Sequence, residues 1–144
     1  MKPHRVHNER GSAAVEAVAG AAVFAAFCGV AYFGGQLGLA HQTVQVAAAE
    51  AARSASIARN PGSAASAAAT AAQQVLDNHQ LSCVTSSVTV DTSGFAVPLG
   101  QPAWVSATVT CQVAGRELGI PVALGSVHVE QTMRSPLDTF RPRT

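Results

Sequence analysis

Residues 17–40 read AVAGAAVFAAFCGVAYFGGQLGLA and carry no charged side chain. The strictly apolar part, residues 17–35, is close to the roughly 20 residues that a helix needs to cross the hydrocarbon core of a membrane. Alanine and glycine make it only mildly hydrophobic, so a buried helical hairpin in a soluble protein is the alternative. The length of the run and its lack of charge favour a membrane-spanning helix.

The charges that flank this segment predict its orientation. Three basic residues precede it, and the next definite cation, Arg53, lies well beyond it. Because basic residues stay on the cytoplasmic side, we expect residues 1–11 in the cytoplasm and the rest of the chain outside. A secretory signal peptide has the same layout, with a cleavage site near residues 47–49, but the apolar run is long for such a signal. The three basic residues are Lys2, Arg5 and Arg10.

An acidic residue, Glu16, stands at the start of the apolar segment. A carboxylate at membrane depth is costly and usually marks function, whereas at the headgroup level it would simply stay hydrated. The string over residues 10–16, RGSAAVE, favours a functional role. A short basic leader ending in Gly11, a small residue at Ser12 and a glutamate at the fifth position of the remaining chain resemble the class III signal of type IV prepilins.

Within that group, RGSAAVE resembles the start of TadE-like proteins of the tight-adherence (Flp) pilus system. The resemblance implies that a prepilin peptidase cleaves between Gly11 and Ser12 on the cytoplasmic face and removes residues 1–11 as a leader. Glu16 lies about one helical turn beyond the new Ser12 amine. An ion pair between Glu16 of one subunit and the Ser12 amine of a neighbour would set the register of assembly. We therefore assign Glu16 a role in subunit register, in processing, or in both.

Small residues recur every four positions from Ala13 to Gly29, and a further pair with the same spacing, Gly34 and Gly38, lies nearby. This spacing lets helices approach closely in lipid, although so alanine-rich a segment also produces the pattern by composition alone. The candidate helix-packing residues are Ala13, Ala17, Ala21, Ala25, Gly29, Gly34 and Gly38.

Helix propensity continues beyond the apolar segment. Residues 42–59, QTVQVAAAEAARSASIAR, are rich in alanine and lack proline, and Asn60-Pro61-Gly62 should end the helix. A helix from Ser12 to Arg59 would be about 70 Å long at roughly 1.5 Å per residue, which exceeds a bilayer. Residues 12–60 are thus expected to form a transmembrane helix that projects outward, as in pilins, and the string AAAEAAR within them resembles a stretch of TadE-like chains.

Residues 61–80 are expected to form a second helix or a linker. The helix would run from Ser63 to Asn78 with Ser63 as its N-cap. The Ala, Ser and Thr content of this segment makes a flexible linker the less favoured alternative.

Residues 81–144 are expected to form a β-rich domain outside the cytoplasm. Apolar and polar residues alternate over residues 105–113, which predicts a half-buried strand. Valines at 84, 88 and 90 predict an earlier strand, and Val127, Val129 and Met133 a later one. Turn residues at 92–94 and 100–102 separate the first two strands. The whole chain is therefore expected to have a pilin-like α+β fold with a small antiparallel sheet, and residues 134–141 resemble the C-terminal strand and tail of TadE-like chains.

Cys83 and Cys111 form a candidate disulfide, because disulfides persist outside the cytoplasm. Cys111 falls on the apolar face of its strand, whereas Cys83 comes just before its strand and is out of phase with the valines there. Two free thiols in a cytosolic fold are the alternative. Cys28, inside the apolar run, is expected to act as a small apolar side chain.

The composition and motifs favour no enzyme class. Charged residues make up 12% of the chain, against about 25% in ordinary soluble domains, and aromatic residues 5%. The net charge of +1 does not suggest a nucleic-acid partner. The five histidines lack metal-ligand spacing, no phosphate-binding glycine loop occurs, and no serine lies in a nucleophile elbow. We expect no enzyme activity, cofactor or metal.

Two classes of function follow. The first is a minor pilin-like subunit of a tight-adherence pilus. Its expected partners are a prepilin peptidase, other pilin-like subunits, the pilus assembly platform and membrane lipid. The second is a secreted or membrane-anchored binding protein that uses a general signal sequence and presents its sheet to an external ligand.

Overall fold

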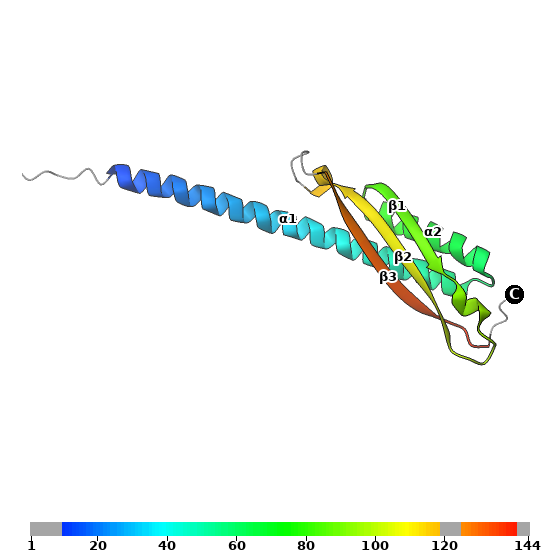
Figure 1. Ribbon diagram of the computed structural model, residues 1–144. Helices are drawn as coiled ribbons and strands as arrows, with labels where there is room; N and C mark the ends of the chain where they lie inside the picture. Colours follow the sequence, from blue (N-terminus) through cyan, green and yellow to red (C-terminus); the bar gives the residue numbers. More distant parts are fainter. Residues whose placement is uncertain (1–9, 119–124, 141–144) are drawn as a thin grey trace, which may run out of the picture. The chain divides into compact units, whose positions relative to one another are not determined.

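The computed structural model describes residues 10–118 and 125–140, with side chains from Ala14 onward (Figure 1). The elements follow the order α1, α2, β1, η1, β2, η2, β3. The chain divides into two compact units, Met1–Gly35 and Gln36–Thr144. The predicted α+β fold, with a long N-terminal apolar helix, a shorter second helix and a small antiparallel sheet, is confirmed.

Helix α1 spans Arg10–Ile57, a length of 48 residues. It begins two residues before the expected Ser12 and ends two residues before the expected Arg59. From Ala14 it is long and apolar enough to cross a membrane. The residues from Ala14 to Tyr32 are all exposed.

Helix α2 spans Pro61–Asn78, so the linker alternative is wrong and the expected N-cap at Ser63 is wrong as well. Asn60 is the N-cap: its side-chain oxygen accepts a hydrogen bond of 2.8 Å from the backbone N–H of Ser63. Pro61 occupies the first helical position, where its missing N–H costs no helical hydrogen bond. The Asn-Pro-Gly string therefore starts the second helix as well as separating it from the first.

The three strands are β1 (Cys83–Asp91), β2 (Ala103–Ala114) and β3 (Ser126–Leu137). They form an antiparallel sheet in the order β1-β2-β3, with β2 in the centre. The short 3₁₀ helix η1 (Ser93–Ala96) follows β1, and a second one, η2 (Gly115–Leu118), follows β2. Gly100, in the turn before β2, has a φ of 88°, a conformation that glycine adopts without strain.

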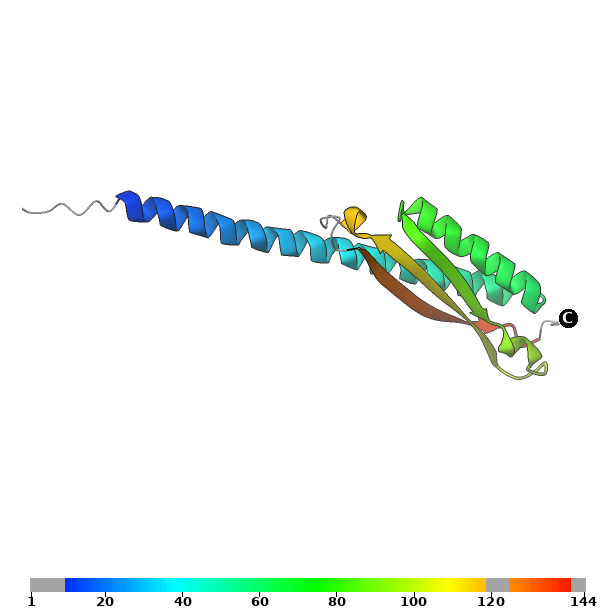
Figure 2. The same ribbon diagram turned by 45° about the horizontal axis from the view of Figure 1, so that its top comes forward.

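One face of the sheet packs on two helices within the second unit. Figures 1 and 2 show α2 and the C-terminal part of α1 beside each other behind the sheet. The alternation predicted for residues 105–113 is confirmed, with its apolar members fully buried. Ser135 of β3 donates a hydrogen bond of 3.0 Å to the hydroxyl of Ser56 on α1. The helices contribute mainly alanines to this core: Ala47, Ala48, Ala51, Ala55, Ala64, Ala68 and Ala72, with Val44 and Leu76 as the larger members.

The core of the second unit is well packed although it contains few large side chains, because its small residues let the elements approach closely. Alanines four apart on α2, from Ala64 to Ala72, form a narrow stripe that lets the helix backbone come close to its neighbours. Close-packed interiors depend on contact density rather than on side-chain size. The low aromatic content of the sequence is therefore compatible with a fully packed core.

Candidate functional site

The residues of the expected processing site lie at the start of α1. The helical backbone begins at Arg10, so the Gly11–Ser12 bond falls within its first turn. The side chains of Ser12 and Ala13 and most of the leader lie outside the described part of the chain. Glu16 is described, and its side chain is exposed. Among the side chains that the structure describes, no ion pair involves Glu16.

The apolar stretch of α1 presents large side chains to its surroundings. Phe24 and Phe27 are 69% and 70% exposed, and several valines are exposed to a similar degree. Each buried square ångström of such surface is worth about 25 cal/mol when it leaves water. A bilayer or the helices of other subunits would recover this free energy.

The glycines of the expected packing stripe have open surroundings. At Gly29, Gly34 and Gly38 an added Cβ atom would meet no atom within 4 Å apart from the local helix. The described alanines of the stripe, Ala17, Ala21 and Ala25, are exposed. Among the described residues, no contact therefore requires small residues at these positions, and their role as a packing surface stays a prediction.

Cys83 and Cys111 form a disulfide, as predicted, with their Cα atoms 5.4 Å apart. The pairing register shifts between Cys83 and Thr85, which leaves Val84 as an extra residue in β1. The shift moves Cys83 opposite Val113, on the same face as Cys111. The apparent phase error of Cys83 in the sequence is thus the signature of a β-bulge, and the extra residue, Val84, is 62% exposed.

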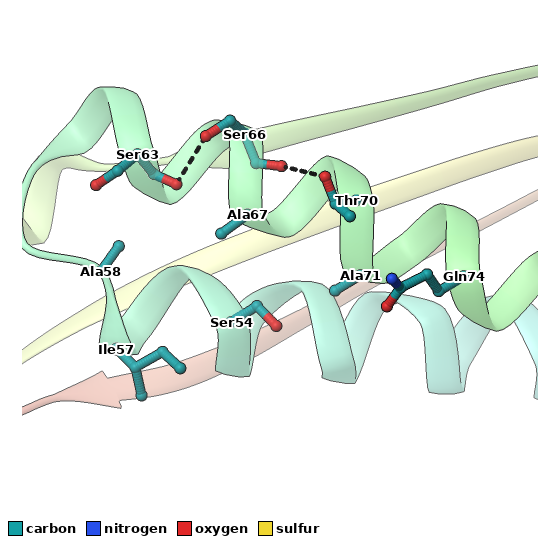
Figure 3. Close-up of a pocket in the computed structure, with 9 residues that line it drawn as sticks. All are labelled: Ser54, Ile57, Ala58, Ser63, Ser66, Ala67, Thr70, Ala71 and Gln74. Atoms are coloured by element: carbon teal, nitrogen blue, oxygen red, sulfur yellow. Dashed lines mark hydrogen bonds between the residues drawn. The ribbon is translucent and has the colours of Figure 1, made fainter.

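A groove of about 590 Å³ runs between α1 and α2 on the side away from the sheet (Figure 3). Its lining carries no charged residue. Three hydroxyls already donate to backbone carbonyls: Ser63 to Asn60 at 3.0 Å, Ser66 to Ser63 at 3.1 Å, and Thr70 to Ser66 at 3.0 Å. The groove therefore presents no charged group and few available hydroxyl groups to a ligand. Its lining residues are Ser54, Ile57, Ala58, Ser63, Ser66, Ala67, Thr70, Ala71 and Gln74.

A second cleft, of about 520 Å³, lies at one end of the sheet and has a different chemical character. Trp104, Asp91 and Arg134 line it, together with Ser106. The backbone N–H of Ser93 donates to Asp91 at 2.9 Å. The pKa of Asp91 lies below its ordinary value of 3.8. The main cause is this backbone hydrogen bond, followed by a hydrogen bond from the Ser93 side chain and by the positive charge of Arg134. An ionised carboxylate and a guanidinium thus share one cleft with an exposed indole.

Sequence reasoning missed this cleft, although two signals were present. Trp104 is the one tryptophan of the chain, and it occupies a polar position in the alternating pattern of its strand. Asp91 and Arg134 lie 43 positions apart in the sequence, and only the strand register brings each of them opposite Ser106. Among the described residues, no three His, Cys, Asp or Glu side chains gather as a metal site.

Comparison of the chain with known protein families, with curated proteins and with solved structures found no match.

Proposed function

We propose that the protein is a TadE-like minor pilin that takes part in the assembly of a tight-adherence pilus. The observation that carries the proposal is an exposed apolar helix that begins with the string RGSAAVE, so that Glu16 lies near its start. The second helix and the disulfide-linked sheet fit the layout expected of a pilin-like subunit. An enzyme activity is not part of the proposal.

In this proposal the helix anchors the chain in the membrane with its N-terminus in the cytoplasm. The three cations ahead of the apolar run favour that orientation. The disulfide supports an oxidising location for the second unit, because cytosolic thiols are kept reduced. Prepilin peptidase, other pilin-like subunits, the assembly platform and membrane lipid are the proposed partners.

The test is the N-terminus of the mature chain after expression together with a prepilin peptidase. The proposal predicts a chain that starts at Ser12, as measured by N-terminal sequencing and intact mass. A start near Glu50, or a retained Met1, would contradict it, because the first outcome indicates a general secretory signal and the second indicates no processing.

A pair of matched variants sharpens this test. Gly11→Leu places a bulky side chain at the cleavage position and should abolish processing. Gly20→Leu makes the same change further along α1, where a Cβ atom meets no atom within 4 Å. It should be processed normally. Equal processing of both variants would argue against cleavage after Gly11.

A further inference from the structure

The face of the sheet that points away from the helices is covered with hydroxyl groups. Register brings Thr89, Thr108 and Thr132 into one row across the three strands, and Thr108 and Thr132 are hydrogen bonded at 2.7 Å. In the next row, Ser87 and Thr110 are bonded at 2.6 Å. These bonds hold the strands in a fixed register and give the face a regular polar surface.

At one end of this face, charged and aromatic side chains replace the rows of hydroxyl groups. Asp91 and Arg134 both lie opposite Ser106, so that a carboxylate, a hydroxyl and a guanidinium form one row. Trp104 comes two residues before Ser106 on the same face and pairs across the sheet with Pro136. It is 55% exposed, although the buried face of the same strand takes only small or medium apolar residues.

The wall of the cleft is held in place by close backbone packing. A Cβ atom on Gly94 of η1 would collide with the Trp104 carbonyl, so only glycine lets η1 approach β2 this closely. Gly94 and Val97 line the cleft beside Trp104, and Pro102 lies just before the strand. The backbone of Trp104 is therefore fixed between η1 and the central strand, and Trp104 is one of the residues that line a preformed cleft of about 520 Å³.

We propose that this cleft binds a neutral oligosaccharide, with a sugar ring stacked on Trp104 and its hydroxyls bonded to Asp91 and Arg134. A pyranose ring has an apolar face of C–H groups, which suits the electron-rich face of an indole. Its hydroxyls both donate and accept, so neighbouring hydroxyls can donate to a carboxylate and accept from a guanidinium.

Other ligand classes fit this cleft less well. An anionic ligand would meet the carboxylate of Asp91, and a cationic ligand would meet Arg134. A purely apolar ligand would desolvate both charged groups without replacing their hydrogen bonds, which is costly. The site lies wholly in the second unit. The inference is therefore independent of the pilus proposal and holds or fails without it.

The experiment is a binding titration of the full chain in a detergent that has no sugar headgroup. Neutral oligomers of glucose, galactose, mannose and N-acetylglucosamine serve as probes. The indole N–H resonance of Trp104 is followed by NMR, which is unambiguous because the chain has one tryptophan. We expect at least one oligomer to shift this resonance in a saturable manner.

Variants then test the assignment of the site by calorimetry with the bound oligomer. Trp104→Ala should weaken its affinity by about tenfold or more, and Trp104→Phe should recover part of it. Arg134→Gln should weaken it as well. The matched controls are Gln112→Ala, on the same strand and face, and Glu130→Gln, a charge on the same face of β3. Both should bind as the parent chain does.

Three outcomes would overturn the proposal. The first is the absence of a saturable Trp104 shift with every probe. The second is an unchanged affinity in Trp104→Ala with the fold intact. The third is binding of inorganic phosphate, with no sugar bound, that Arg134→Gln abolishes and Trp104→Ala retains, which would indicate an anion site instead.

Discussion

Glu16 is the residue on which the proposed assembly step depends. Its exposed carboxylate lies at the start of an apolar helix, where an unpaired charge in lipid is unfavourable. In the assembled state it would pair with the Ser12 amine created by cleavage.

Glu16→Gln should therefore impair assembly while leaving membrane insertion unharmed or improved. Loss of one partner of a buried ion pair typically costs about 3–5 kcal/mol, so the loss of assembly should be nearly complete. Crosslinking of subunits in the membrane measures it. Glu50→Gln, the same change on the same helix beyond the apolar run, is the control. Equal crosslinking of the Glu16 variant and the parent chain would rule out the pairing.

Asp91 should titrate at an unusually low pH. The Ser93 hydrogen bonds and the charge of Arg134 lower its pKa, so ionised Asp91 favours the folded state. This contribution is present above the unfolded-state pKa and is lost as the pH falls toward the folded pKa. A carboxyl NMR titration should give a midpoint below 3.8. A midpoint at or above that value would contradict the geometry of the cleft.

The start of helix α2 depends on the N-cap Asn60, which the sequence pattern did not identify. Asn60 accepts the N–H of Ser63, so Asn60→Ala should lower the free energy of unfolding by about 1 kcal/mol. Ser63→Ala keeps this backbone hydrogen bond and should cost less. Chemical denaturation of the two variants measures the difference, and a larger loss in Ser63→Ala would contradict the assignment of the cap.

At the scale of the sheet, the disulfide braces β1 against β2. It closes a loop with a sequence separation of 28 residues, which corresponds to about 3–4 kcal/mol in the chain-entropy model. Replacing both Cys83 and Cys111 by alanine should therefore lower the unfolding midpoint in denaturant. Cys28→Ala, which changes the free and exposed cysteine, should not. An identical midpoint in the oxidised parent chain and the double variant would show that the bridge adds no stability.

The fold as a whole is predictable because two patterns in the sequence are strong. The uncharged run of residues 17–40 predicts a long apolar helix, and the alternation over residues 105–113 predicts a half-buried strand. The bulge at Val84 is not predictable in this way, because a single extra residue resembles a phase error until the partner strand is known. The N-cap is ambiguous in the sequence because Asn60 and Ser63 are both good caps, and Pro61 suits a helix start as well as a helix end.

The candidate sites differ in how well the sequence alone predicts them. Gly11, Ser12 and Glu16 are neighbours in the chain, so a local motif suffices to suggest them. The cleft of Trp104, Asp91 and Arg134 depends on strand register and on the packing of Gly94, which no local pattern encodes. Contacts between subunits in a membrane form only in the assembly. The sequence of a single chain therefore indicates which helix surface could pack, but not which residues meet.

The proposed part of this chain in building a tight-adherence pilus can be measured by electron microscopy of surface pili on host cells that lack the gene for the chain. We expect these cells to lose their pili. The parent chain should restore them, whereas the Gly11→Leu variant should not. Normal piliation of cells without the chain would rule out this role.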